Sequence, residues 1–162
     1  MILNIEMIPK SSWKSNLRSI LKQSQWDIVR NICYEKAAYG CEICHTRPKK
    51  GQLHCHEVWE FDDKMHIQKL VRLEAVCGLC HSCKHIGFTV MQHFNASKDL
   101  EPVIDHFLRV NQITLDEFQE YLDKELKIWQ KRSEHAWDVN IYYLEDYLFN
   151  EGISMNNLFN KN

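Results

Sequence analysis

The amino-acid sequence predicts an α+β fold that is mostly helical, with a small β-containing core between two helical parts. One observation is that residues 11–38 and 97–149 carry apolar residues at helical spacings. The other is that residues 40–94 hold most of the cysteines and histidines, with short alternations of apolar and polar residues. The chain has 162 residues, 44% of them hydrophobic, so we expect residues 1–162 to form a single domain around one core.

The amino-terminal part predicts a helix from Ser11 to about Ala38, because apolar residues recur there at helical spacings without an internal Pro or Gly. Lys14, Arg18 and Lys22 follow at intervals of four and would lie on one face of this helix. Two interpretations stay open for that face. It is either a solvated surface, the usual role of such charges, or a nucleic-acid-binding surface that contacts phosphates.

The middle of the chain predicts the β-structure. The segment "QLHCHEVWEF", residues 52–61, is typical of a strand, and "LEAVC", residues 73–77, of a second short element. A helix is expected from Leu79 to about Phe94, interrupted near Gly87.

The carboxy-terminal part predicts further helices that pack rather than form a site. One is expected over residues 97–110, with Pro102 tolerated in its first turn. Thr114 and Glu117 form a capping-box pattern at the start of the next helix. Its apolar stripe consists of Leu115, Phe118, Leu122, Leu126 and Trp129.

Charge is distributed unevenly along the chain, whose formal net charge is −2. Residues 1–98 contain 14 Lys and Arg against 9 Asp and Glu, whereas residues 99–162 contain 6 against 13. The positive half therefore coincides with the cysteines and histidines, which favours a nucleic-acid partner there.

No segment approaches the roughly 20 consecutive apolar residues of a membrane span, and the start of the chain lacks the pattern of a secretory signal. We therefore expect a cytoplasmic protein without a membrane partner. The sequence does not indicate an oligomeric state.

Two Cys-x-x-Cys pairs, Cys41 with Cys44 and Cys77 with Cys80, predict a structural zinc site. An odd total of seven cysteines without a signal peptide favours thiolate ligands over disulfides. Cys83 lies close enough in sequence to replace Cys80 as a ligand.

Histidines beside these pairs predict a second, open metal site. His81 and His85 are four residues apart, so one helix face would present both to a single ion. The strand segment His54-Cys55-His56-Glu57 offers further ligands. A single histidine would more often be structural, but the pair at ligand spacing favours function.

From Cys41 to His85 the sequence resembles the zinc-knuckle form of the HNH, or ββα-metal, endonucleases. The resemblance rests on the order of cysteine pair, strand histidine, cysteine pair and helix histidines. It implies a zinc-stapled ββα-metal core flanked by amino- and carboxy-terminal helices, and an enzyme that hydrolyses phosphodiester bonds in DNA. It makes His56 the general base, and His81 and His85 ligands of a catalytic divalent ion (Mg²⁺, Mn²⁺, Ni²⁺ or Zn²⁺).

The sequence departs from the family pattern at two positions. Cys55 stands where the family has an Asp or His metal ligand, and as a ligand it would favour zinc over magnesium. Arg72 stands where an Asn orients the base, and a guanidinium cannot accept a hydrogen bond. Gln68 has an amide that could replace the Asn, and Glu57 could be an oxygen ligand or orient a histidine.

Three interpretations therefore stay open. The chain is a metal-dependent endonuclease, a catalytically impaired factor with the same fold that binds nucleic acid or protein as an inhibitor or recruiter, or a purely structural zinc module. The trio of His56, His81 and His85 favours the first, because neither a binder nor a structural module requires it.

Overall fold

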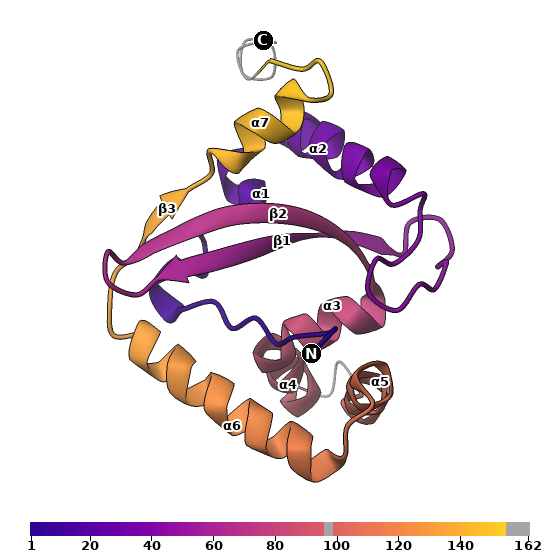
Figure 1. The fold of residues 1–162 in the computed structure, drawn as a ribbon, viewed down its shortest axis with the longest axis vertical. Coiled ribbons are helices and arrows are strands. Elements are labelled where there is room, and N and C mark those ends of the chain that lie inside the picture. The colour runs from indigo at the N-terminus through magenta and orange to yellow at the C-terminus, as the bar shows by residue number, and fades with distance from the viewer. Residues whose placement is uncertain (96–98, 155–162) are drawn as a thin grey trace.

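A long β hairpin lies at the centre of the molecule, which a computed structural model describes for residues 1–95 and 99–154 (Figure 1). Strand β1 (Leu53–Asp62) pairs antiparallel with β2 (Ile67–Cys77), with a bulge after Val58. The short β3 (Asp138–Asn140) adds in parallel to the start of β2. Both predicted strand segments are present, and the second is longer than expected.

Helices cover both faces of the hairpin (Figure 1). On one face lie α1 (Leu17–Ile20), α2 (Gln23–Lys36) and α7 (Tyr143–Phe149). On the other face lie α3 (Gly78–Lys84), α4 (Ile86–Phe94), α5 (Glu101–Asn111) and α6 (Leu115–Arg132). The described residues also include a 3₁₀ turn, η1 (Lys10–Ser12). The predicted α+β class is confirmed.

Each face of the hairpin has its own apolar core. Trp26 and Val29 of α2 pack with Leu73 of β2 and Leu144 of α7 in the first core. In the second, buried residues of α3, α5 and α6 pack around the cysteines that end β2 and begin α3. The hairpin thus separates two helical layers, and the residues of β1 alternate between them.

The predicted continuous helix over residues 11–38 is wrong. Asn16 caps α1 by accepting a hydrogen bond from the Ser19 backbone, and Leu21 is extended with φ −92° and ψ 146° before α2 begins. Leu21 is buried in the first core, so its packing explains why the helix ends there. Local helical spacing did not reveal this tertiary contact.

The other helices lie close to their predicted positions. The break between α3 and α4 falls at His85, two residues before Gly87. The predicted start at residue 97 lies outside the described residues, and Pro102 occupies the first turn of α5. The capping box of α6 is confirmed, because Thr114 N donates to Glu117 Oε2 over 2.8 Å. Among the described residues, no helix has the length and apolar character needed to cross a membrane.

Candidate metal centres

Four cysteines from two distant segments form a cluster that can bind a zinc ion. Cys41 and Cys44 lie in the turn after α2, Cys77 ends β2, and Cys80 lies in the first turn of α3. Their Sγ atoms are all within 4.8 Å of one another, and those of Cys44 and Cys77 are 3.6 Å apart. Thiolates about 2.3 Å from a tetrahedral zinc lie about 3.8 Å from one another. The structure therefore brings together the four predicted ligands in a suitable arrangement.

Backbone hydrogen bonds hold the first cysteine pair in place. Cys41 N donates to Thr46 O, and His45 N donates to Cys41 O, each over 2.9 Å. His45 has a φ of 60°, so the chain turns sharply immediately after Cys44. This tight turn presents both sulfurs to the end of β2.

A buried histidine that sequence reasoning missed supports this cluster. His106 Nε2 of α5 lies 3.1 Å from Cys80 Sγ, and Arg109 Nη2 lies 3.0 Å from His106 Nδ1. Because a guanidinium only donates, Nδ1 accepts and Nε2 carries the hydrogen that is directed at Cys80. Such a partner orients a metal ligand and tunes its charge.

Cys83 is not part of the cluster. Its Sγ donates to Val103 O over 3.2 Å, on the side of α3 that faces α5. The suggestion that Cys83 could replace Cys80 therefore finds no support.

Three histidines form a second cluster beside the first. The ring nitrogens of His56 on β1 and of His81 and His85 on or beside α3 lie within 4.8 Å of one another. His54, also on β1, stacks on His81 with ring centroids 4.5 Å apart and an angle of 8° between the planes. The predicted base and both predicted helix ligands are therefore adjacent, and their nitrogens can reach a single divalent ion.

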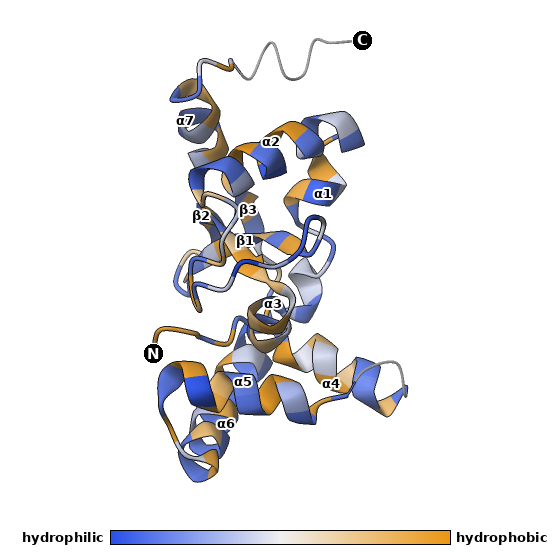
Figure 2. Cartoon of the chain, turned by 90° about the vertical axis from the view of Figure 1, so that its right-hand side faces the viewer, coloured by the Kyte–Doolittle hydropathy of each residue, from blue (hydrophilic) through white to orange (hydrophobic). Residues whose placement is uncertain are grey.

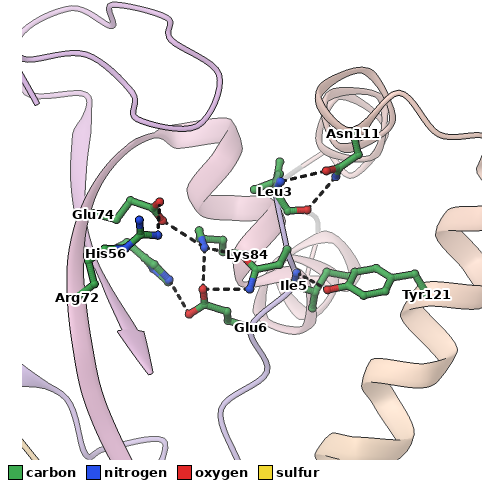
Figure 3. Close-up of polar contacts among 10 residues, drawn as sticks. Leu3, Ile5, Glu6, His56, Arg72, Glu74, Lys84, Asn111 and Tyr121 are labelled. Atoms are coloured by element: carbon green, nitrogen blue, oxygen red, sulfur yellow. Dashed lines mark hydrogen bonds and ion pairs between the residues drawn. The ribbon is translucent and has the colours of Figure 1, made fainter. Parts of the chain in front are cut away.

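Glu6 is the residue that orients His56. Its Oε2 lies 2.9 Å from His56 Nε2, and its Oε1 accepts a hydrogen bond from Lys84 Nζ over 2.7 Å (Figure 3). Burial alone would raise the pKa of Glu6, but the hydrogen bond and charge of His56, together with Lys84, lower it to about 2. Because an ionised carboxylate only accepts, His56 Nε2 donates and its Nδ1 keeps the lone pair of the neutral ring.

Lys84 connects this pair to the hairpin. The side chain is only 2% exposed, and its Nζ bonds Asn4 Oδ1 at 2.9 Å and lies 3.3 Å from Glu74 Oε2. Glu74 in turn accepts from Arg72 Nη2 over 2.7 Å. A buried lysine requires such partners, because desolvation without them is costly (Figure 3).

The amino-terminal segment that carries Glu6 is fixed by hydrogen bonds from both sides (Figure 3). Asn111 of α5 bonds the backbone of Ile2 and Leu3, and Tyr121 of α6 accepts from Ile5 N over 3.2 Å. Glu6 N donates to the carbonyl of Lys84 over 2.8 Å. These contacts hold the carboxylate at a fixed position.

His85 remains neutral in this environment. Burial and the charge of His56 lower the pKa of His85 to about 4. A neutral imidazole has the free lone pair that a metal ligand needs.

The prediction that Cys55 is a ligand of the catalytic ion is wrong. Side chains alternate along a strand, so Cys55 faces α2 while His54 and His56 face α3. A hydrogen bond with Cys33 and burial raise the pKa of the Cys55 thiol, which keeps it protonated among apolar residues.

Neither Gln68 nor Arg72 takes the position of the missing Asn. His56 is paired with Glu74 across the hairpin, and Gln68 lies six residues further along β2, on the order of 20 Å away. Gln68 therefore does not orient His56. Arg72 lies near the site but directs its guanidinium to Glu74. Glu6 supplies the acceptor instead.

Glu57 belongs to the other face of β1. Both its carboxylate oxygens lie 3.1 Å from Leu17 N, at the start of α1. Burial raises its pKa to about 7, against the opposing effects of that hydrogen bond and of Arg18. Glu57 is thus neither an oxygen ligand of the histidine cluster nor a partner that orients a histidine.

The three predicted nucleic-acid-binding residues are exposed but do not share one helix face. Lys14 precedes α1, Arg18 lies within it, and Lys22 is the residue before α2. Only Arg18 lines the cleft described next. The break at Leu21 is the reason for the difference.

A cleft of about 1010 Å³ opens onto the histidine cluster. Its lining includes all four histidines of β1 and α3, with residues of the amino-terminal segment, α1, α4 and α6. The histidine cluster is accessible from outside, whereas three of the four cysteines are buried.

No family model matches the sequence, and neither a curated protein nor a solved structure shows a significant match to it.

Proposed function

We propose that the chain is a metal-dependent endonuclease that hydrolyses phosphodiester bonds in DNA. The observation that carries this proposal is the open cluster of His56, His81 and His85, in which the carboxylate of Glu6 holds His56. The order of motifs that resembles the HNH endonucleases supports the same reaction. In this proposal the four cysteines hold a structural zinc, which contributes to folding and takes no part in the chemistry.

His56 is the general base. Its Nε2 donates to Glu6, so Nδ1 can take a proton from a water molecule that attacks phosphorus. The Glu6 carboxylate fixes the ring and stabilises the imidazolium that results. This arrangement replaces the amide that the family pattern would place elsewhere.

His81 and His85 would hold the catalytic ion, which can be Mg²⁺, Mn²⁺, Ni²⁺ or Zn²⁺. Such an ion supplies positive charge against the charge that develops on the phosphate and the leaving oxygen. Three imidazole nitrogens favour the borderline metals among these four.

A second candidate is a catalytically impaired factor that binds nucleic acid or protein, for example an inhibitor or recruiter. The loss of Cys55 from the cluster favours it, because one family ligand then has no counterpart. Incubation of supercoiled plasmid with the purified protein separates the two. The nuclease converts it to nicked or linear DNA only with an added divalent ion, and the impaired factor leaves it supercoiled with all four metals.

A further inference from the structure

The cleft at the histidine cluster has features that define the strand it accepts, if the proposed nuclease function holds. It lies across the open edge of β1, between α1 on one side and α4 on the other (Figure 2). Its walls are largely apolar and include Ile8, Leu126 and Trp129.

Two large aromatic side chains in the cleft lining are exposed. Trp13 is 53% exposed and Phe88 is 62% exposed. Trp13 is nevertheless fixed, because its Nε1 donates to Ile8 O over 2.8 Å. A rigid ring with a free face is a platform on which a nucleobase can stack.

Positive charge lies at the margins of the same cleft. Arg18 and Arg30 line it, and so does Gly51 in the loop between Cys44 and β1. The three basic residues of this loop are exposed, and no ion pair among the described residues includes them: Arg47, Lys49 and Lys50. The acidic side chains of the lining are Glu6, which is paired with Lys84, and Glu57, which accepts from Leu17 N.

Two buried polar side chains of the cleft lining have no hydrogen-bond partner. They are Ser12, next to Trp13, and Gln68, whose amide nitrogen and oxygen are both unpaired. An amide offers one donor and one acceptor, which is also the pattern on the edge of a base. Buried groups left unpaired in this way require an explanation, and a bound ligand provides one.

We propose that the cleft binds an unpaired stretch of DNA, with a base stacked on Trp13 and its phosphates beside Arg18 and the loop over residues 47–50. In a duplex, both faces of every base are covered by its neighbours, so Trp13 could contact only an unstacked base. The preferred substrate is therefore single-stranded DNA, or a single-stranded segment within a duplex, rather than a regular double helix.

Fluorescence anisotropy without added divalent ion tests this on the full chain, with a labelled 12-nucleotide strand and the same sequence as a duplex. We expect tighter binding of the single strand. Trp13→Ala should weaken it about 5- to 150-fold, and Trp13→Phe should stay within about threefold of the wild type because it keeps a ring. Phe149→Ala removes an aromatic residue that is 76% exposed outside the cleft, and should change nothing.

The loop is tested separately by Lys49→Gln with Lys50→Gln. This change should flatten the salt dependence of single-strand binding by about 0.7 per lost contact, and leave melting temperature unchanged. Equal affinity for both DNA forms, or equal losses in Trp13→Ala and Phe149→Ala, would overturn the proposal.

Because no cleavage is measured, a failure here is distinct from a failure of the nuclease proposal. A protein that cuts plasmid but binds both DNA forms equally would refute only the stacking site. A protein that prefers the single strand through Trp13 without cutting any DNA would support this site and refute the nuclease.

Discussion

Glu6 and His56 are separated by 50 positions in the chain, yet Glu6 Oε2 lies 2.9 Å from His56 Nε2. The amino-terminal segment therefore contributes to the candidate active site, although it lies outside the region with the family resemblance. The carboxylate does what the family pattern assigns to an Asn, and it also neutralises the buried Lys84.

The two roles of Glu6 can be measured separately. Glu6→Gln should lower the cleavage rate about 10- to 100-fold, because the ring of His56 loses a charged acceptor. It should also destabilise the fold, since Lys84 loses a buried counter-charge. Adding Lys84→Met should restore the melting temperature but not the rate. Recovery of both would show that Glu6 acts through stability alone.

The four-cysteine cluster predicts about one tightly held zinc per chain after dialysis. Cys44→Ser and Cys77→Ser should give unfolded or insoluble protein, because metal binding and folding are coupled. Cys83→Ser is the matched control, and it should keep its zinc because Cys83 bonds a carbonyl outside the cluster. Metal analysis with circular dichroism measures both. A well-folded wild type without zinc would refute the structural site.

The corrected ligand set predicts different effects for Cys55 and His81. His81→Ala should weaken binding of Mn²⁺ or Ni²⁺ about 10- to 100-fold, and more metal should partly restore cleavage. Cys55→Ser should leave metal affinity unchanged, because its side chain faces α2. Calorimetric titration of zinc-loaded protein measures these affinities. A loss in Cys55→Ser equal to that in His81→Ala would return Cys55 to the site.

The exposed basic residues near α1 predict a graded effect on DNA binding. Arg18→Gln should reduce the salt dependence, with a change of slope of about 0.7 to 0.9 for one lost phosphate contact. Lys22→Gln should have little effect, because Lys22 does not line the cleft. Affinities measured across a salt series give the slopes. Equal slopes for Arg18→Gln and the wild type would leave Arg18 as solvated surface.

Local patterns in the sequence predicted a substantial part of this structure. The alternation around residues 52–61 predicted β1, and the spacing of His81 and His85 predicted that both would reach one point. The same alternation also contained the signal that Cys55 and His56 face opposite sides, because adjacent strand residues do so. The family pattern led to the other assignment.

The remaining features depend on contacts between distant parts of the chain. Glu6 is exposed to no pattern that sequence spacing can read, since its partners are His56 and Lys84. The helix break at Leu21 follows from burial in a core that α7 completes, and His106 reaches Cys80 only because α5 packs on α3. A single sequence carries no local signal for such contacts.

The central claim is that His56 is the base of a hydrolytic site. The most direct test is the rate of DNA cleavage by His56→Ala against the wild type, with added divalent ion and with zinc content and melting temperature recorded for both. His93→Ala is the control, because His93 is an exposed histidine of α4 outside the cluster. We predict a loss of about 10²- to 10⁴-fold for His56→Ala, with zinc and stability retained, and no loss for His93→Ala. Equal rates for His56→Ala and the wild type, or no cleavage by the wild type with any of the four metals, would contradict the account.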